Sequence, residues 1–260
     1  GRHGEAPLPI LAPQSPSHCF EVAIEAARIA IEWRTPVILL SDGYLANGTE
    51  PWRLPEVADL PTINPNFVTE PNLPGTNGDG GFAPYQRDPA TLARDWALPG
   101  TPGLMHRIGG LEKEDGSGNV SYDPANHEHM VRLRAKKVAG IAEHIPELEV
   151  RGDVSDAEIL VVGWGSTWGA IDGAVDRVRA SGHRVASVHL THLHPFPVNL
   201  EHILRAYDKV LVPELNLGQL SHQLRAEFLV DARSFTKVNG LPLTAVEIEQ
   251  AIIDHLGGLL

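Results

Sequence analysis

The sequence predicts an α/β protein with two parallel-sheet parts joined by a long irregular segment. Near the start, an apolar run, a helix-spaced pattern and a second apolar run follow one another, and from about residue 156 strand-like and helix-like segments alternate three times. Such alternation is typical of a parallel sheet with helices on its faces. Between the two parts, residues 51–104 contain ten prolines and little periodicity. We therefore predict three domains, at residues 1–50, 51–150 and 151–260.

The first part reads as strand, helix, strand. Leu8–Ala12 is a short apolar run, and Ser15 followed by Pro16 is typical of a helix start. Apolar residues then recur at helical spacing as far as Trp33, and Val37–Leu40 is a second apolar run. Two strands are too few for a stable sheet, so we expect further strands upstream or from another chain.

The middle part is rich in loop residues. A long piece without periodicity is usually a lid, an arm lying on a partner or a solvated linker, and all three remain open here. Asp123–Val138 is the exception, because Met130, Leu133 and Val138 recur on one side of a predicted helix.

The last part has the clearest pattern. Its boundary lies near the polar stretch Val150–Asp156. We predict strands at residues 158–162, 185–190 and 209–213, and helices at 168–180, 200–206, 219–229 and 247–256.

Composition limits the function. The net charge of −12 makes a nucleic acid or an anionic membrane surface an unexpected partner. No apolar run reaches the ~18 residues of a membrane-spanning helix, and no secretory signal is evident. A single cysteine, Cys19, excludes an internal disulfide and any zinc site or iron–sulfur cluster built from several cysteines of this chain. We expect a cytoplasmic protein and, since the chain starts without methionine, a segment of a longer protein or its mature product.

Gly163, Gly165 and Gly169 follow an apolar run and resemble a dinucleotide-binding loop. Such a site also needs an acidic residue at the end of the second strand, but residues 188–195 contain no Asp or Glu. Two bulky tryptophans also flank the loop. We therefore predict close packing or a subunit contact here, and keep an NAD(P)-binding dehydrogenase domain as an alternative.

No metal site is predicted. Gly78-Asp79-Gly80 resembles the start of a thiamine diphosphate and Mg²⁺ motif, but the next asparagine, Asn119, is too far along the chain, so we interpret the triplet as a turn. His127 and His129 are two residues apart and would point in different directions on a helix. Three loop histidines have no carboxylate or cysteine nearby: His189, His192 and His194.

Glu214, Asn216 and Gln219 follow a predicted strand directly and open a helix. Ligands and partners collect at the carboxyl ends of strands in open α/β sheets. These three residues are therefore candidates for a subunit interface or a site, although Asn216 fits a plain helix start equally well.

Several motifs, taken in order, carry a family resemblance. They are the opening Gly-Arg-His-Gly-Glu-Ala-Pro, residues 41–45, Gly110-Leu111-Glu112 with Gly116, His127, Met130, Arg134 and Lys137, residues 161–166, His194-Pro195 and residues 213–220. On these motifs the chain resembles the large (alpha) subunits of the 2-oxoacid:ferredoxin oxidoreductases, and most closely those that act on 2-oxoglutarate. Lys113 departs from the pattern, because many relatives have histidine there.

The resemblance implies both a fold and a reaction. The fold would be the end of a pyrimidine-binding thiamine-enzyme domain followed by a parallel α/β domain like the C-terminal domain of transketolase. In the reaction, thiamine diphosphate attacks the ketone of a 2-oxoacid, CO₂ leaves, and electrons pass singly through a [4Fe-4S] cluster to ferredoxin. Coenzyme A takes the acyl group, which for 2-oxoglutarate gives succinyl-CoA.

The resemblance also implies where the chemistry lies. The diphosphate, Mg²⁺ and the cluster would be held by a beta subunit in an α2β2 assembly, and the catalytic glutamate would lie before Gly1. No catalytic residue is therefore assigned. Arg2, His3, Arg107 and Glu112 are substrate-proximal candidates, although ordinary surface ion pairs remain open for each. A non-catalytic assembly module is a further alternative.

Overall fold

The computed structural model describes residues 5–74, 80–107, 109–153 and 155–258. The chain forms two compact units, each assembled from several stretches of sequence. The first comprises Gly1–Pro9, Ile24–Ile38 and Pro55–His144, and the second comprises Ile10–Ala23, Leu39–Leu54 and Ile145–Leu260. None of the described helices combines the length and apolar character that crossing a membrane requires.

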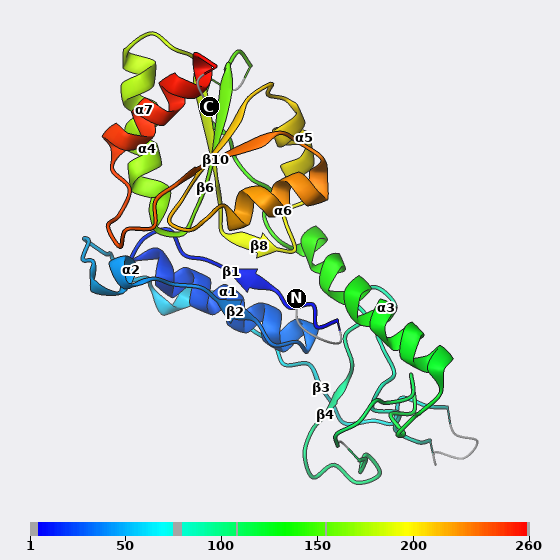
Figure 1. The fold of residues 1–260 in the computed structure, drawn as a ribbon. Helices are drawn as coiled ribbons and strands as arrows, with labels where there is room; N and C mark the ends of the chain where they lie inside the picture. Colours follow the sequence, from blue (N-terminus) through cyan, green and yellow to red (C-terminus); the bar gives the residue numbers. More distant parts are fainter. Residues whose placement is uncertain (1–4, 75–79, 108, 154, 259–260) are drawn as a thin grey trace. The chain divides into compact units, whose positions relative to one another are not determined.

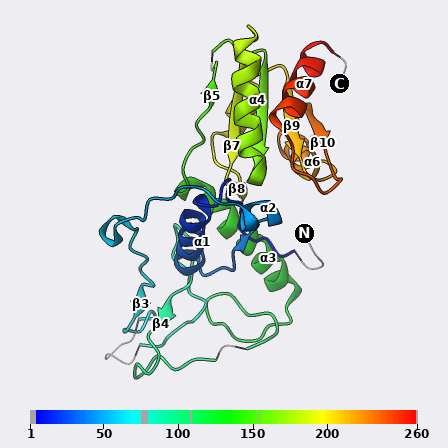
Figure 2. The ribbon, with the colours of Figure 1, turned by 90° about the vertical axis from the view of Figure 1, so that its left-hand side faces the viewer.

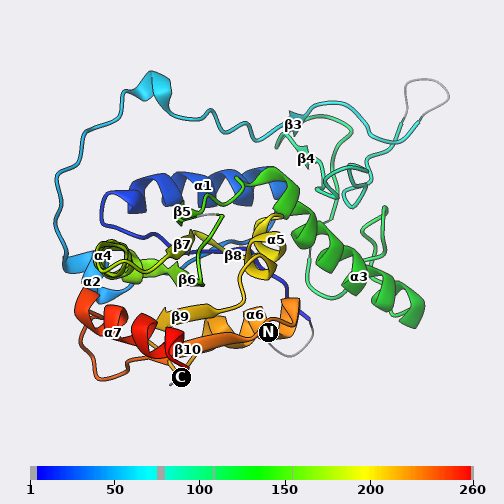
Figure 3. The same cartoon turned by 90° about the horizontal axis from the view of Figure 1, so that it is seen from above.

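The second unit contains a five-stranded sheet in the order β10-β9-β6-β7-β5 (Figure 3). The central strand β6 (Ile159–Trp164) pairs in parallel with β7 (Val185–Leu190) and with β9 (Val210–Glu214). β10 (Ala232–Thr236) extends the sheet in parallel beside β9, and β5 (Arg151–Gly152) ends it antiparallel beside β7. The predicted parallel sheet is therefore confirmed.

Helices cover both faces of this sheet (Figure 1). α4 (Trp168–Ala180) and α7 (Ala245–Leu256) pack together on one face, whereas α5 (Leu200–Arg205) and α6 (Gln219–Phe228) lie on the other. Because both faces of β6 are covered, residues 159–163 are all buried, which explains the uninterrupted apolar run in the sequence. The four predicted helices of this region are confirmed to within two residues at each end.

The two edge strands of this sheet were not predicted. β5 lies in the stretch that we interpreted as a polar boundary. β10 buries Ala232 but leaves Arg233, Ser234 and Thr236 exposed. Edge strands with mostly exposed side chains lack the apolar runs by which the central strands were recognised.

A smaller sheet has the order β2-β1-β8. Its strands are β1 (Ile10–Leu11), β2 (Ile38–Leu39) and β8 (His192–His194), and β8 pairs antiparallel with β1. The Leu40 N–H donates to the Leu11 carbonyl over 2.8 Å, beside β2 and β1. The predicted strand–helix–strand pattern is thus confirmed, with α1 (His18–Trp33) between the first two strands. The third strand, which was not predicted, comes from this chain.

The first unit contains the proline-rich segment and one long helix, α3 (Pro124–Gly140). Asp123 caps α3, because its carboxylate accepts from the Ala125 N–H at 3.0 Å, and Pro124 occupies the first helical position. Regular structure in the rest of the segment is sparse (Figure 2). The remaining short elements of the chain are α2 (Gly43–Asn47), η1 (Val57–Asp59), β3 (Phe67–Val68), β4 (Trp96–Ala97), η2 (Ile141–His144) and η3 (Gly165–Thr167).

The glycines after β6 have separate structural reasons. A Cβ on Gly163 would lie 2.4 Å from Ile171 Cδ1 and 2.8 Å from His189 Nδ1, so this glycine allows α4 to pack closely on the sheet. Gly165 has a φ of +59°, a conformation that side chains disfavour. A Cβ on Gly169 would meet no atom within 4 Å, so packing does not require a glycine there. Packing, the predicted role of this loop, accounts for Gly163.

Replacing Gly163 with alanine should destabilise the fold by roughly 1–3 kcal/mol, because Ile171 and His189 must move to make room. Urea unfolding monitored by circular dichroism measures the change. Gly169→Ala is the matched control, because it adds the same methyl group inside α4 in open space and should be neutral or stabilising. Equal losses from both substitutions would contradict the packing role of Gly163.

Candidate functional site

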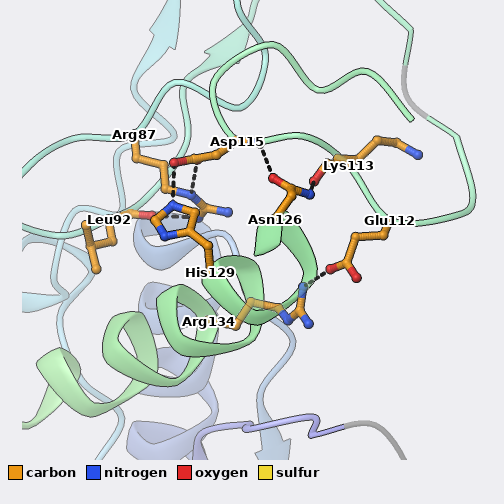
Figure 4. A network of polar contacts seen from close by, with 8 residues as sticks. All are labelled: Arg87, Leu92, Glu112, Lys113, Asp115, Asn126, His129 and Arg134. Atoms are coloured by element: carbon orange, nitrogen blue, oxygen red, sulfur yellow. Dashed lines mark hydrogen bonds and ion pairs between the residues drawn. The ribbon is translucent and has the colours of Figure 1, made fainter. Parts of the chain in front are cut away.

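In the first unit, Glu112 binds two residues of α3. Its Oε1 accepts from Arg134 Nη1 at 3.0 Å (Figure 4), and its Oε2 contacts His127 Nδ1. The hydrogen bonds from His127 and then Arg134 hold the pKa of Glu112 below its ordinary value. This candidate residue is therefore an ionised carboxylate that ties a loop to α3.

A second carboxylate of the same loop repeats the arrangement. Asp115 Oδ2 lies 2.8 Å from His129 Nε2, and Asp115 Oδ1 lies 3.6 Å from Arg87 Nε (Figure 4). Asn126 completes the attachment, because its side chain donates to the Lys113 carbonyl at 3.0 Å and accepts from the Asp115 N–H at 3.3 Å. The loop is thus held against the first two turns of α3.

The helix explains the spacing of the motif residues. His127, Met130, Arg134 and Lys137 are three or four positions apart and share one face of α3. Met130 and Lys137 are buried, and Lys137 Nζ donates to the Arg34 carbonyl at 3.1 Å. Burial lowers the pKa of Lys137 to about 8, with a smaller effect from the nearby arginines. The motif residues of α3 therefore act as attachment points along one helix face.

The residue that departs from the family pattern also has a structural role. Lys113 is buried, and its Nζ donates to the carbonyls of Leu111, at 3.0 Å, and Gly110. Arg107 is exposed, and no ion pair joins it to another residue in the described part of the chain. Arg2 and His3, with Gly78 and Asp79, lie outside the described residues.

The histidines considered as metal ligands have other surroundings. His127 and His129 face different carboxylates, as their spacing predicted. Within residues 5–74, 80–107, 109–153 and 155–258, no three His, Cys, Asp or Glu side chains are grouped as metal ligands would be.

In the second unit, the Glu214 carboxylate is completely buried at the end of β9. It accepts from four neutral donors, which are Trp164 Nε1 (3.2 Å), Asn216 Nδ2 (3.2 Å) and the N–H groups of Leu220 (2.8 Å) and Ser221 (3.2 Å). The two N–H groups belong to the first turn of α6, whose capping residue is a glycine without a side chain to accept them. Glu214 therefore replaces the missing cap and joins β6 to the start of α6.

The other two predicted residues complete this turn. Asn216 Oδ1 accepts from the N–H groups of Gly218 and Gln219, each at 2.8 Å, so Asn216 has the helix-start role that the sequence left open. The Gln219 side chain is exposed. Glu214 is fully buried, so any contribution of this residue to an interface would pass through the turn that it holds.

A cavity of about 780 Å³ lies beside this turn, within the second unit. It is formed where β6, β9 and β10 end, and its walls come from residues 13, 40–45, 164–167, 215–216, 219, 237–238 and 240–242. The role of Asp42 in one wall was not predicted. Its carboxylate caps α2 through the N–H groups of Tyr44 and Leu45, and it also accepts from the Ser166 hydroxyl. The position of Asp42 directly after a strand and before Gly43 was the available signal.

Replacing Glu214 with glutamine should destabilise the protein by about 1–3 kcal/mol. The new NH₂ group cannot accept a hydrogen bond, so at least one of the four donors loses its buried partner. Chemical denaturation measures the change. Glu227→Gln, on the exposed face of the same helix, should change stability by less than about 0.5 kcal/mol, and a comparable loss there would refute the proposed role of Glu214.

His189 should make stability depend on pH. Burial lowers its pKa to about 3 from an ordinary value of 6.5, so between these pH values the unfolded chain binds a proton that the folded chain does not. The free energy of unfolding is therefore not reduced by His189 above about pH 6.5. It decreases as the pH falls toward 3, by up to about 1.4 kcal/mol per pH unit. Denaturation at several pH values should show a shallower slope for His189→Gln than for the natural protein. His222→Gln, at an exposed position on α6, is the matched control, and an equally shallow slope for it would contradict the role of His189.

Two sequence profiles match the chain. Residues 2–117 match the profile described as pyruvate flavodoxin/ferredoxin oxidoreductase, thiamine diphosphate-binding. Residues 157–249 match the profile described as pyruvate:ferredoxin oxidoreductase core domain II. The second match covers most of the five-stranded sheet and its helices.

Curated relatives align along nearly the whole chain. The 2-oxoglutarate oxidoreductase subunit KorA of Mycobacterium tuberculosis is 54% identical over 260 residues, covering 100% of this chain and 38% of the relative. The 2-oxoacid:ferredoxin oxidoreductase 2, subunit alpha, of Aeropyrum pernix is 33% identical over 263 residues, covering 96% of this chain and 38% of the relative. The chain therefore spans about two-fifths of the length of these relatives.

A solved structure has the same fold. The 2-oxoglutarate:ferredoxin oxidoreductase from Magnetococcus marinus, solved with 2-oxoglutarate, coenzyme A and succinyl-CoA bound, superimposes with a TM-score of 0.86 at 31% identity. The alignment covers 98% of this chain and 43% of that one. From its motifs, its fold and these relatives, the chain belongs to the 2-oxoacid:ferredoxin oxidoreductase family and matches part of an alpha subunit.

Proposed function

We propose that the chain is part of the alpha subunit of a thiamine diphosphate-dependent enzyme that oxidises 2-oxoglutarate to succinyl-CoA and CO₂, with ferredoxin as electron acceptor. The observation that carries the proposal is the 54% identity, along all 260 residues, to a subunit named for 2-oxoglutarate. The bound 2-oxoglutarate and succinyl-CoA of the Magnetococcus marinus relative support the same substrate and product.

The donor groups of this chain do not fit the inorganic part of the proposed chemistry. An iron–sulfur cluster is commonly held by four cysteines, and the sequence has one. The described residues also lack a group of three carboxylate, histidine or cysteine ligands for Mg²⁺. On the family resemblance, with which this donor set is consistent, we propose that a beta subunit holds the [4Fe-4S] cluster, Mg²⁺ and the diphosphate in an α2β2 assembly. A cytoplasmic location remains a prediction.

The candidate site residues divide by their contacts. Arg107 is exposed and free of ion pairs in the described part of the chain, so it is the candidate that could still pair with a carboxylate of a substrate or partner. Glu112 is already occupied by His127 and Arg134, and we propose that it positions the loop preceding α3. Arg2 and His3 stay substrate-proximal candidates. Glu214, Asn216 and Gln219 stay interface candidates, with the turn held by Glu214 as the contacting element.

An activity assay tests the proposal. The complete protein containing this chain, purified with its beta subunit, should reduce ferredoxin only when 2-oxoglutarate and coenzyme A are both present. Pyruvate lacks the distal carboxylate and should support a rate at least about 100-fold lower in kcat/KM, because a site built for a polar group discriminates strongly against an analogue without it.

The 260-residue chain alone is the matched control and should not decarboxylate 2-oxoglutarate. Full activity from the isolated chain would contradict the assignment of the cofactors to a partner. NAD(P)H formation in place of ferredoxin reduction would favour the dehydrogenase alternative.

A further inference from the structure

The cavity in the second unit lies at a point set by the topology of the sheet. From β6 the chain continues through α4 to β7 on one side, and later returns through α5 to β9 on the other side of β6. The order of strands therefore reverses between β6 and β9. Ligands in open α/β sheets bind in the crevice at the carboxyl ends of the strands where this reversal occurs.

The cavity and this crevice coincide. The turn after β6 and the turn after β9 form two of its walls, and the turn after β10 forms a third. Its volume of about 780 Å³ is within the range of small-molecule sites, roughly 300–1,000 Å³. The reversal of strand order and the cavity therefore indicate the same place in the unit.

The charged groups around the cavity already have hydrogen-bond partners within the unit, and the lysine in its lining is paired with a glutamate. Lys237 Nζ donates to both carboxylate oxygens of Glu247, at 2.7 and 2.9 Å, and to the Pro242 carbonyl at 2.9 Å. Asp42 is bonded to the first turn of α2 and to Ser166. Four donors surround Glu214. A negatively charged ligand would therefore lose its hydration here without gaining an unpaired cation from the described lining residues.

Neutral hydrogen-bonding groups remain available. The Gln219 side-chain amide makes no hydrogen bond within the described residues, and only one of the two Asn216 Nδ2 hydrogens is used, toward Glu214. Trp164 lines the cavity with its indole nitrogen bonded to Glu214, and Leu241 adds an apolar side chain that is 63% exposed. Amides beside aromatic and aliphatic groups suit a ring with polar edges and apolar faces.

We propose that this cavity binds an uncharged heteroaromatic ring system of the size of a purine nucleoside. The Gln219 and Asn216 amides would bond the edge of the ring, and Trp164 and Leu241 would contact its faces. The proposal does not depend on the proposed function, because it rests on the sheet topology, the cavity and the neutral lining alone.

Calorimetric titration of adenosine into the complete protein, purified in its native assembly, tests the proposal. We expect saturable binding of one adenosine per chain with a Kd between about 10 μM and 1 mM. AMP carries the same base with a charged phosphate and should bind about 10-fold more weakly, since the cavity offers no unpaired cation among its described lining residues. The absence of saturable adenosine binding up to about 5 mM, or tighter binding of AMP or inorganic phosphate, overturns the proposal.

Matched variants locate the binding. Gln219→Ala should weaken adenosine binding about 5–10-fold, whereas Gln223→Ala, one turn later on the exposed face of α6, should have no effect. Leu241→Ala should weaken it about 3–10-fold, whereas Leu217→Ala, an exposed leucine outside the cavity lining, should not. All four side chains are exposed, so the variants should fold. Equal effects within either pair would place the binding elsewhere and refute the proposal.

Discussion

In the second unit, one buried carboxylate joins the ends of two strands to the start of a helix. Glu214 is removed from water at the end of a parallel strand and is satisfied by four neutral donors, without a cation. Burying a charge is costly unless its hydrogen bonds are complete, and the positive end of α6 adds a favourable dipole interaction. The same set of bonds fixes the indole of Trp164, the turn at Asn216 and the start of α6. The geometry of the cavity wall thus follows from the hydrogen bonds that the protein supplies to the buried Glu214 carboxylate.

The first unit uses carboxylates differently. Glu112 and Asp115 are partly exposed and face cationic or imidazole groups rather than backbone N–H groups. Three of their partners, His127, His129 and Arg134, belong to α3, so a loop with little regular structure takes its position from a helix. A helix and a few ion pairs thereby position a proline-rich segment that has little regular structure of its own.

The central elements could be predicted because the burial of their side chains leaves an apolar pattern in the sequence. β6, β7 and β9 are buried on both faces, and α3 and α4 carry clear starts or apolar faces. β5, β8 and β10 could not be predicted from the sequence. β5 and β8 have only two and three residues, which is too short for a periodic pattern, and β10 is mostly exposed and lacks an apolar run. The role of Glu214 was equally hidden, because one of its donors, Trp164, is 50 positions away in the sequence. Gly163 was ambiguous for a related reason, since close approach of a phosphate and close packing of a helix both require the absence of a side chain.

The edges of the five-stranded sheet have a consequence for behaviour at high protein concentration. An unpaired strand edge can recruit the edge of a neighbouring molecule, and long flat edges favour aggregation. One edge here is the two-residue strand β5, which offers too few backbone groups for stable pairing. The other is β10, where the exposed Arg233 is paired with Asp231 at 2.9 Å and places charge beside the open backbone. The strands that carried least information in the sequence are therefore the ones suited to keep separate copies of the chain from joining their sheets.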